Sequence, residues 1–281
     1  MKKVGVVGCG QMGGGIAQVI AQSGYQVVVS EINNEFLEKG LTVIKKALAK
    51  SVEKEKITKQ DEEAILGRLK GTTDIKDFAD CDLIVEAAIE DMAEKKKLFA
   101  SLDQICPAHT IISSNTSSLS ITEMAMATKK PDKVVGLHFF NPVPVMKLVE
   151  VVKTILASEE SINAAKSFAE SLGKTVVLAK DTPGFIVNRL LGPYVFDAIR
   201  VYESGAASRE DIDQAMALGA NHPIGPLSLA DLIGLDVCYH IAESMYQEYR
   251  EARFAPPVLL KRMVTAGHLG RKTGKGFYDY K

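Results

Sequence analysis

Apolar residues in the first half of the chain follow two alternating patterns. Short apolar runs, such as Val4–Val7 and Leu83–Val85, are typical of strands that are buried on both faces of a sheet. The longer segments between such runs carry apolar residues at helical spacing, as Ile16, Val19 and Ile20 do. Strands that alternate with helices predict an α/β fold, in which helices cover the faces of a mainly parallel sheet.

The other elements of this half are predicted from the same patterns. Further strands are expected at 26–30, 110–114, 134–140, 147–152 and 175–179, and helices at 34–55, 58–69, 91–105 and 158–173. Thr58 and Ser158 are typical N-cap residues, and Gly173 is typical of a helix end.

The pattern changes at Asp181–Gly184, after which only helices and loops are predicted. Helices are expected at 185–203, 209–218, 230–250 and 257–266. The sequence therefore predicts two domains, an α/β domain at residues 1–182 and an all-α domain at residues 183–281.

Composition and charge make several classes of function improbable. The chain carries 34 basic and 35 acidic residues, so we expect no nucleic-acid partner and no anionic membrane surface. No apolar run approaches the roughly 18 residues that span a bilayer, and Met1–Lys3 leads directly into a strand, which predicts no targeting peptide. Four cysteines without a C-x-x-C motif indicate a reducing cytoplasm and no metal site.

Three glycines follow the first predicted strand and begin the first predicted helix in the pattern G-x-G-x-x-G. Gly8 allows a tight turn, Gly10 lets a pyrophosphate approach the backbone, and Gly13 lets helix and strand pack closely. The helix start offers unpaired N–H groups and a positive dipole end to phosphates. We therefore predict a Rossmann-type, doubly wound domain with Gln11 and Met12 among its cofactor-binding residues. The alternative is a glycine-rich turn that binds nothing.

Glu31 favours the cofactor interpretation and indicates which cofactor is bound. It ends the second strand, 18 residues after Gly13, close to the spacing of about 20 expected for a ribose-binding carboxylate. A carboxylate there accepts hydrogen bonds from a ribose 2′-hydroxyl and repels a 2′-phosphate. No arginine follows in Ile32–Asn34, and the nearest cation is Lys39. NAD is therefore predicted, and NADP is disfavoured.

Ligands of an open α/β sheet bind beyond the carboxyl ends of its strands. The polar groups that we expect near this edge are Glu86, Glu90, residues 115–118 and His138. The helical half is expected to contribute others.

His138 and Glu150 are the candidates for proton transfer. Oxidation of an alcohol by NAD needs a base near neutral pH, for which histidine is suited. Glu150 lies within the apolar run Leu148–Val152, where a carboxylate is costly to bury without a partner. A His–Glu pair would satisfy the carboxylate, orient the ring and stabilise an imidazolium. The alternative is a strand histidine with purely structural hydrogen bonds.

Two further features each allow a structural and a functional interpretation. Asn188 lies at the domain junction, where its amide could bind a substrate oxygen or form a structural hydrogen bond. Lys46, Lys50 and Lys54 form a cationic stripe at i, i+4 and i+8 of a predicted helix. This stripe is either a solvated helix face or a clamp for a phosphate-bearing part of the substrate.

The sequence resembles a known family over nearly the whole chain, and five motifs are the most specific parts of the resemblance. They are Ser114–Leu119, Gly136–Pro144, Asp181–Arg189, His222–Pro226 and Gly270–Tyr278. On these motifs the sequence resembles the L-3-hydroxyacyl-CoA dehydrogenases, and among them the short bacterial 3-hydroxybutyryl-CoA dehydrogenases. The resemblance implies NAD-dependent interconversion of an (S)-3-hydroxyacyl-CoA and a 3-ketoacyl-CoA. It also implies a homodimer whose contact is made by the helical half.

The resemblance implies roles for individual residues as well. His138 corresponds to the general acid/base, Glu150 to its orienting carboxylate, and Ser117 and Asn188 to hydrogen-bonding groups at the reacting oxygen. The implied NAD contacts are Glu90, Lys95, Asn115, Ser117 and Lys272, and the implied contacts to the CoA nucleotide are Lys50 and Lys54. Glu31 is a departure, because many relatives have aspartate there.

Two alternative functions remain at this point. One is a dehydrogenase of free 3-hydroxy acids or sugar acids that uses no CoA. The other is a non-catalytic NAD-binding protein, which is disfavoured because Ser117, His138, Glu150 and Asn188 are all present.

Overall fold

The chain folds into two compact units, which are described separately. The computed structural model describes residues 1–280; the first unit is Met1–Asp181 and the second begins at Thr182. The strands are β1 (Lys3–Val7), β2 (Gln26–Ser30), β3 (Leu69–Thr72), β4 (Leu83–Glu86), β5 (Ile111–Ser114), β6 (Val134–Phe139), β7 (Leu148–Lys153) and β8 (Thr175–Lys180). The helices of the first unit are α1 (Gln11–Gln22), α2 (Asn34–Glu53), α3 (Lys59–Gly67), α4 (Met92–Ile105), α5 (Ile121–Ala125) and α6 (Glu159–Ser171).

A single sheet forms the centre of the first unit. Its strand order is β3-β2-β1-β4-β5-β6-β7-β8, with β1 near the middle. Neighbouring strands from β3 to β6 are parallel, β7 is antiparallel to β6, and β8 is parallel to β7. The carboxyl ends of β1, β4, β5 and β6 therefore lie at one edge of the sheet, where ligands of this fold class bind.

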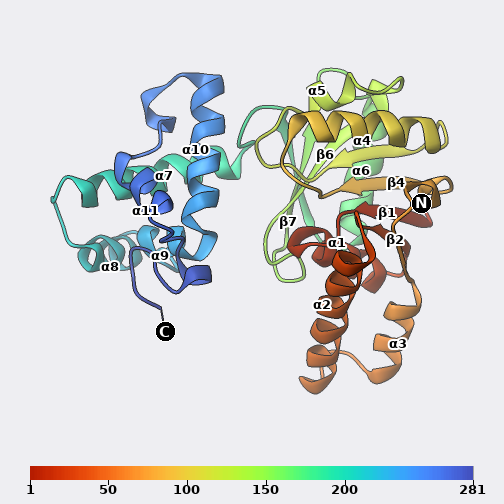
Figure 1. The fold of residues 1–281 in the computed structure, drawn as a ribbon, viewed down its shortest axis with the longest axis horizontal. Helices are drawn as coiled ribbons and strands as arrows, with labels where there is room; N and C mark the ends of the chain where they lie inside the picture. The colour runs from red at the N-terminus through yellow and green to blue at the C-terminus, as the bar shows by residue number, and fades with distance from the viewer. Residues whose placement is uncertain (281) are drawn as a thin grey trace. The chain divides into compact units, whose positions relative to one another are not determined.

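Helices cover both faces of this sheet. One core joins α1, α2 and α6 to every second residue of the strands, including Val135, Leu137 and Phe139 of β6. Because side chains alternate along a strand, Gly136 and His138 face the other side. A Cβ at Gly136 would lie 2.4 Å from Ile121 Cδ1 of α5, so this second face is the one that α5 covers. Helices α2 and α3 lie side by side and extend beyond the sheet (Figure 1).

The predicted α/β class is confirmed, but two local predictions were wrong. The helix expected at 58–69 ends at Gly67, and Leu69 begins β3 at the sheet edge. The helix expected at 230–250 is two helices, α9 (Pro226–Ile233) and α10 (Leu235–Tyr249), separated by Gly234 at φ 106°. The sheet also contains one antiparallel pair, because β7 returns beside β6 after the short connection at residues 140–147.

The second unit is mainly helical. Besides α9 and α10 it contains α7 (Val187–Glu203), α8 (Arg209–Gly219) and α11 (Val258–Thr265). Its core brings together residues of α7, α9, α10 and α11, among them Phe196, Leu227, Met245 and Leu260. None of the helices described for residues 1–280 is long and apolar enough to cross a membrane.

A buried carboxylate attaches the C-terminal segment to α9. Asp231 accepts hydrogen bonds from the backbone N–H groups of Phe277 and Tyr278, both at 2.9 Å, and from the Tyr280 hydroxyl at 3.0 Å. Its side chain is 1% exposed. Burial, followed by the hydrogen bond to Asp231, raises the pKa of Tyr280. These three bonds connect the end of the chain to the core of the unit.

Replacing Asp231 by asparagine should destabilise the second unit by about 2 kcal/mol, because an amide cannot accept all three bonds and loses the charge that strengthens them. Urea unfolding followed by tyrosine fluorescence measures this change. The signal comes mainly from this unit, because seven of the eight tyrosines follow residue 182 and tryptophan is absent. Asp279→Asn, at an exposed position of the same segment, is the matched control. Equal midpoints for both variants would contradict the prediction.

Candidate active site

The three glycines of the turn between β1 and α1 have different surroundings. Gly8 has φ 93° and its N–H donates to Ser30 O at 2.9 Å, which fixes the turn against β2. A Cβ at Gly13 would lie 2.0 Å from Gly8 O, so only glycine lets α1 start this close to the strand. A Cβ at Gly10 would meet nothing within 4 Å. The protein itself therefore leaves open the space beside Gly10.

A large pocket adjoins this turn. Its volume is about 1030 Å³, and it is lined by the turn, by Glu31, by the first half of α2, by Ala87–Ile89 and by Asn141–Pro144. Gln11 lines it too, and Gln11 Nε2 donates to Asn141 Oδ1 at 3.2 Å. The volume is ample for an elongated dinucleotide. The open space at Gly10 and the N–H groups of the first turn of α1 suit its pyrophosphate.

Glu31 lies at the far side of the turn and is bonded to it. Its Oε1 accepts from Cys9 N at 2.7 Å and its Oε2 accepts from Ile32 N at 3.1 Å. Each carboxylate oxygen has a second lone pair, so the group retains acceptor capacity for a ribose hydroxyl. Helix α2 packs against the same turn, because a Cβ at Gly40 would lie 2.3 Å from Cys9 O.

His138 and Glu150 are directly opposite one another on β6 and β7. His138 Nδ1 lies 2.6 Å from Glu150 Oε2, so the contact that the sequence suggested is confirmed. The histidine is 5% exposed and the glutamate 0%. A carboxylate held this closely in a buried site fixes the orientation of the ring.

Asn115 and Ser117 belong to the segment that follows β5. Asn115 Oδ1 accepts from Phe139 N at 2.9 Å, and Asn115 N donates to Glu86 O at 2.7 Å. Asn115 thus connects the ends of β4, β5 and β6. The half-buried Ser117 lies within this connected region, next in sequence to the buried Thr116 and Ser118.

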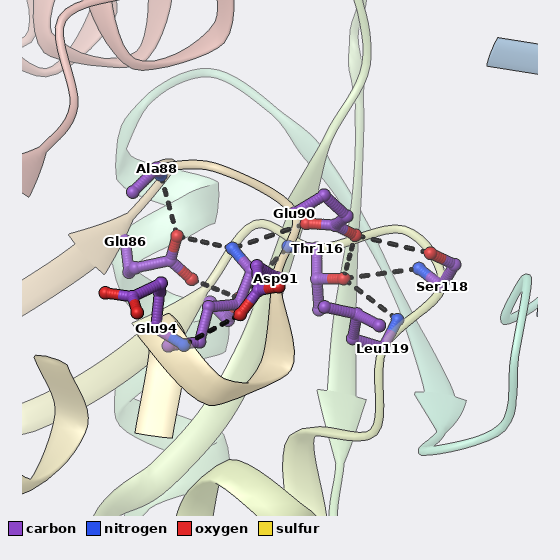
Figure 2. A network of polar contacts seen from close by, with 10 residues as sticks. Glu86, Ala88, Glu90, Asp91, Glu94, Thr116, Ser118 and Leu119 are labelled. Carbon is purple, nitrogen blue, oxygen red and sulfur yellow. Dashed lines mark hydrogen bonds and ion pairs between the residues drawn. The ribbon is translucent and has the colours of Figure 1, made fainter. Parts of the chain in front are cut away.

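Lys95 is buried between two carboxylates. Its Nζ lies 2.5 Å from Glu86 Oε1 and 3.3 Å from Glu90 Oε2, and the lysine is 1% exposed. Figure 2 shows Glu86 and Glu90 with the hydroxyl groups of Thr116 and Ser118 around this centre. The sequence placed Glu86 near the carboxyl edge of the sheet but assigned it no role. Glu150 was singled out because it is a carboxylate within an apolar run. The same argument applies to Glu86, which ends a fully apolar strand.

Lys174 is a further residue that sequence reasoning missed. Its Nζ donates to Val143 O at 2.7 Å and to Met146 O at 2.8 Å, and so holds the segment between β6 and β7 that lines the pocket. Burial lowers the pKa of Lys174. No pattern in the sequence relates this lysine to that segment, because the partners are backbone carbonyls.

The remaining predicted residues belong to the second unit or to the end of α2. Asn188 is the second residue of α7 in the second unit. Lys272, also in that unit, donates to Asp236 Oδ2 at 2.6 Å. Lys50 and Lys54 are exposed at the end of α2, the helix whose first half lines the pocket.

Thiolate and metal chemistry have no support in the part of the chain that is described. Burial raises the pKa of the thiols to about 11 for Cys9 and Cys106 and to about 12 for Cys81 and Cys238. For Cys9 the Glu31 carboxylate adds to the effect of burial. Residues 1–280 contain no group of three or more His, Cys, Asp or Glu side chains that could hold a metal ion.

A Rossmann-type sheet with this glycine turn, followed by a helical unit, defines a class of dinucleotide-binding dehydrogenases, and comparison with known proteins identifies the family. The model of the 3-hydroxyacyl-CoA dehydrogenase NAD binding domain matches residues 3–182, and that of the 3-hydroxyacyl-CoA dehydrogenase C-terminal domain matches residues 184–280. The chain belongs to the 3-hydroxyacyl-CoA dehydrogenase family.

Individual relatives agree with this assignment over their full length. A probable 3-hydroxybutyryl-CoA dehydrogenase of Deinococcus radiodurans is 50% identical over 278 residues, which cover 99% of this chain and 100% of the relative. The 3-hydroxybutyryl-CoA dehydrogenase of Clostridioides difficile is 47% identical, with 99% of each chain covered. The crystal structure of (S)-3-hydroxybutyryl-CoA dehydrogenase from Ralstonia eutropha is similar at TM-score 0.96 and 44% identity, covering 100% of this chain and 99% of that one.

Proposed function

We propose that this dehydrogenase interconverts (S)-3-hydroxybutyryl-CoA and acetoacetyl-CoA, with NAD as the hydride carrier. The observation that carries the proposal is the buried His138–Glu150 pair, with 2.6 Å between Nδ1 and Oε2, in a member of this family. His138 precedes the Asn141–Pro144 segment that lines the pocket. The substrate is proposed from the relatives above that are named for 3-hydroxybutyryl-CoA.

In this proposal His138 transfers the proton of the reaction. An ionised Glu150 can only accept a hydrogen bond, so Nδ1 carries the proton and Nε2 of the neutral ring is the base. During oxidation Nε2 takes the hydroxyl proton, and Glu150 stabilises the imidazolium that results. When bound, NAD⁺ supplies the acceptor for the hydride that leaves the carbinol carbon. In the reverse direction His138 donates the proton to the carbonyl oxygen.

The other residues keep the roles that the resemblance implies. Ser117 and Asn188 bind the reacting oxygen, and Glu90, Lys95, Asn115, Ser117 and Lys272 belong to the NAD site. Lys50 and Lys54 bind the CoA nucleotide. Lys95 is 1% exposed, so we propose that it acts on the cofactor site through the carboxylates beside it.

Glu31 supports NAD over NADP in this proposal. Its carboxylate is bonded to Cys9 N and Ile32 N, so it cannot turn away from an incoming 2′-phosphate without breaking these bonds. Repulsion between the two anions would then oppose NADP binding.

A cytoplasmic homodimer completes the proposal. Several large apolar side chains of the second unit are exposed, among them Leu190 at 67%, Leu218 at 77% and Val258 at 56%. These side chains are available for the subunit contact that the resemblance implies for the helical unit. The four cysteines are free and buried, which suits a reducing compartment.

The purified protein should oxidise NADH rapidly when acetoacetyl-CoA is added and should oxidise NADPH much more slowly. The loss of the reduced nicotinamide absorbance band measures both rates. Fast loss with NADH alone would support the reaction and the role of Glu31. Equal or faster loss with NADPH would contradict that role and leave the reaction in place.

Free acetoacetate in place of the thioester separates the alternative functions. Activity on the free acid but not on acetoacetyl-CoA would indicate a dehydrogenase that does not use CoA. No activity with either substrate, in a protein that still binds NADH, would indicate a non-catalytic NAD-binding protein.

A further inference from the structure

Glu86 has no role of its own in the function proposed above and enters it only as a partner of Lys95, yet it lies at the centre of the buried polar network (Figure 2). It is 0% exposed at the end of β4, and its carboxylate accepts three hydrogen bonds. Two of them come to Oε1, from Lys95 Nζ at 2.5 Å and from Ala88 N at 2.7 Å. The third comes to Oε2, from Ser114 Oγ at 2.6 Å. A buried carboxylate is tolerated only with such full satisfaction.

The two oxygens of Glu86 contact different parts of the site. Oε1 accepts a hydrogen bond from Ala88 N and so fixes Ala88, which lines the cofactor pocket. The segment at Ala87 and Ala88 packs against the glycine turn, because a Cβ at Gly8 would lie 2.6 Å from Ala87 O. Oε2 fixes Ser114, whose hydroxyl in turn accepts Thr116 N at 3.1 Å. One carboxylate therefore positions a wall of the cofactor pocket and the start of the segment that carries Ser117.

A second route leads from Lys95 to the same segment. Glu90 lies 3.3 Å from Lys95 Nζ through Oε2, and its Oε1 accepts from the Thr116 and Ser118 hydroxyls. Thr116 Oγ1 also accepts Leu119 N at 3.0 Å and Ser118 N at 3.3 Å. The residues on both sides of Ser117 are thus held by groups that depend on Glu86, directly or through the lysine.

From this geometry we propose that Glu86 is a positioning residue that sets the Ser117 segment for the reaction, an inference that rests on the proposed function. Ser117 is the group assigned to the reacting oxygen, so its placement affects the transition state. A displacement of about 1 Å in a reacting group costs up to about a hundredfold in rate. Glu86 acts without touching substrate or cofactor.

The substitution Glu86→Gln would separate the contact of the carboxylate with Ala88 from its contact with Ser114. The glutamine amide has a single oxygen, which must face Lys95 and Ala88, because an amide N–H group would repel the ammonium. The NH₂ group then faces Ser114 Oγ, which donates its proton to Glu86 in the native protein. The Ser114 proton loses its acceptor, so the connection to Ser117 is loosened while the Ala88 connection is kept.

Glu86→Gln should therefore lower kcat for acetoacetyl-CoA reduction about tenfold, while the Kd for NADH stays within about twofold. Ser114→Ala removes the same connection from its other end and should give the same result. The double variant should lose no more than either single variant, because both changes break one path. If the fold-loss of kcat in the double variant equalled the product of the two single fold-losses, the two residues would act independently, and the proposal that they act through one path would be overturned.

Glu62→Gln is the matched control. Glu62 is also a buried carboxylate, 5% exposed, with a lysine partner 2.5 Å away at Lys59, but it lies on α3 and outside the network. It should leave kcat unchanged. If Glu62→Gln and Glu86→Gln lowered kcat equally, the effect would be a general cost of neutralising a buried charge, and the proposal would fail.

Amide hydrogen exchange provides a readout that does not depend on activity. In Glu86→Gln and Ser114→Ala, exchange should accelerate in a peptide covering residues 114–120 and stay unchanged in peptides of the glycine turn. An inactive wild-type protein would refute the proposed function, yet this exchange pattern would still support the positioning role. Unchanged exchange at residues 114–120 would overturn the positioning role, even in a fully active enzyme.

Discussion

Replacement of His138 by alanine is expected to lower kcat for acetoacetyl-CoA reduction by at least about a hundredfold, the lower end of general acid–base contributions. Without the imidazole no group delivers a proton to the carbonyl oxygen as hydride arrives, and Glu150 is left as a buried carboxylate without this partner. NADH should still bind, because the pocket beside the glycine turn does not include His138. Steady-state kinetics and NADH fluorescence titration measure the two quantities.

His109→Ala is the matched control for this experiment. His109 is also bonded to a carboxylate, with Nε2 at 3.3 Å from Asp82 Oδ1, but its side chain is 65% exposed and it precedes β5, at the opposite edge of the sheet. Its removal should leave kcat unchanged. Turnover close to that of the wild type in His138→Ala would exclude the histidine as the acid/base.

Alanine at Gly10 is expected to weaken NADH binding about a hundredfold, equal to about 2.8 kcal/mol. The expected effect is steric. The space beside Gly10 is open in the protein and is the place proposed for the pyrophosphate, so a Cβ there would clash with the cofactor and not with the protein. Overpacking of a rigid site costs about 1–3 kcal/mol, and here neither the turn nor the pyrophosphate can move aside. Stability should fall by no more than about 1 kcal/mol, the effect of a poorer N-cap for α1.

Two other glycines test whether the effect is specific. Gly13→Ala would force a Cβ to 2.0 Å from Gly8 O, so it should lower stability and NADH affinity together. Gly67→Ala, at the end of α3, meets nothing within 4 Å and should change neither. Full NADH affinity in Gly10→Ala would mean that the pyrophosphate does not approach this position.

The sequence was sufficient for the fold class because its signals are local. The glycine turn, the apolar strands and capping residues such as Ser158 each act within a few residues, and the structure has the corresponding elements. Strand β3 was missed because Leu69–Thr72 is a short edge strand without an apolar run. The break at Gly234 was missed because the flanking helices share one apolar pattern.

Beyond the glycine motif and Glu31, which motif spacing indicates, contacts in the candidate site could be predicted from the residues only where burial made a polar side chain conspicuous. Glu150 stood out within an apolar strand, and its contact with His138 followed from the need of a buried carboxylate for a partner. Contacts with backbone groups give no comparable signal. The bond from Cys9 N to Glu31 and those from Lys174 to two carbonyls depend on turns that only the folded chain defines.

The antiparallel pairing of β6 with β7 makes the His138–Glu150 contact a property of one hairpin. The two residues are close in sequence, so their pairing has low contact order and needs no distant part of the chain to align it. Residues 140–147 form the hairpin connection and include the segment that lines the pocket. Substitutions that keep the length and turn geometry of that connection leave the register of the two strands intact, so the hairpin can acquire a new ligand preference while the proposed proton-transfer pair is kept.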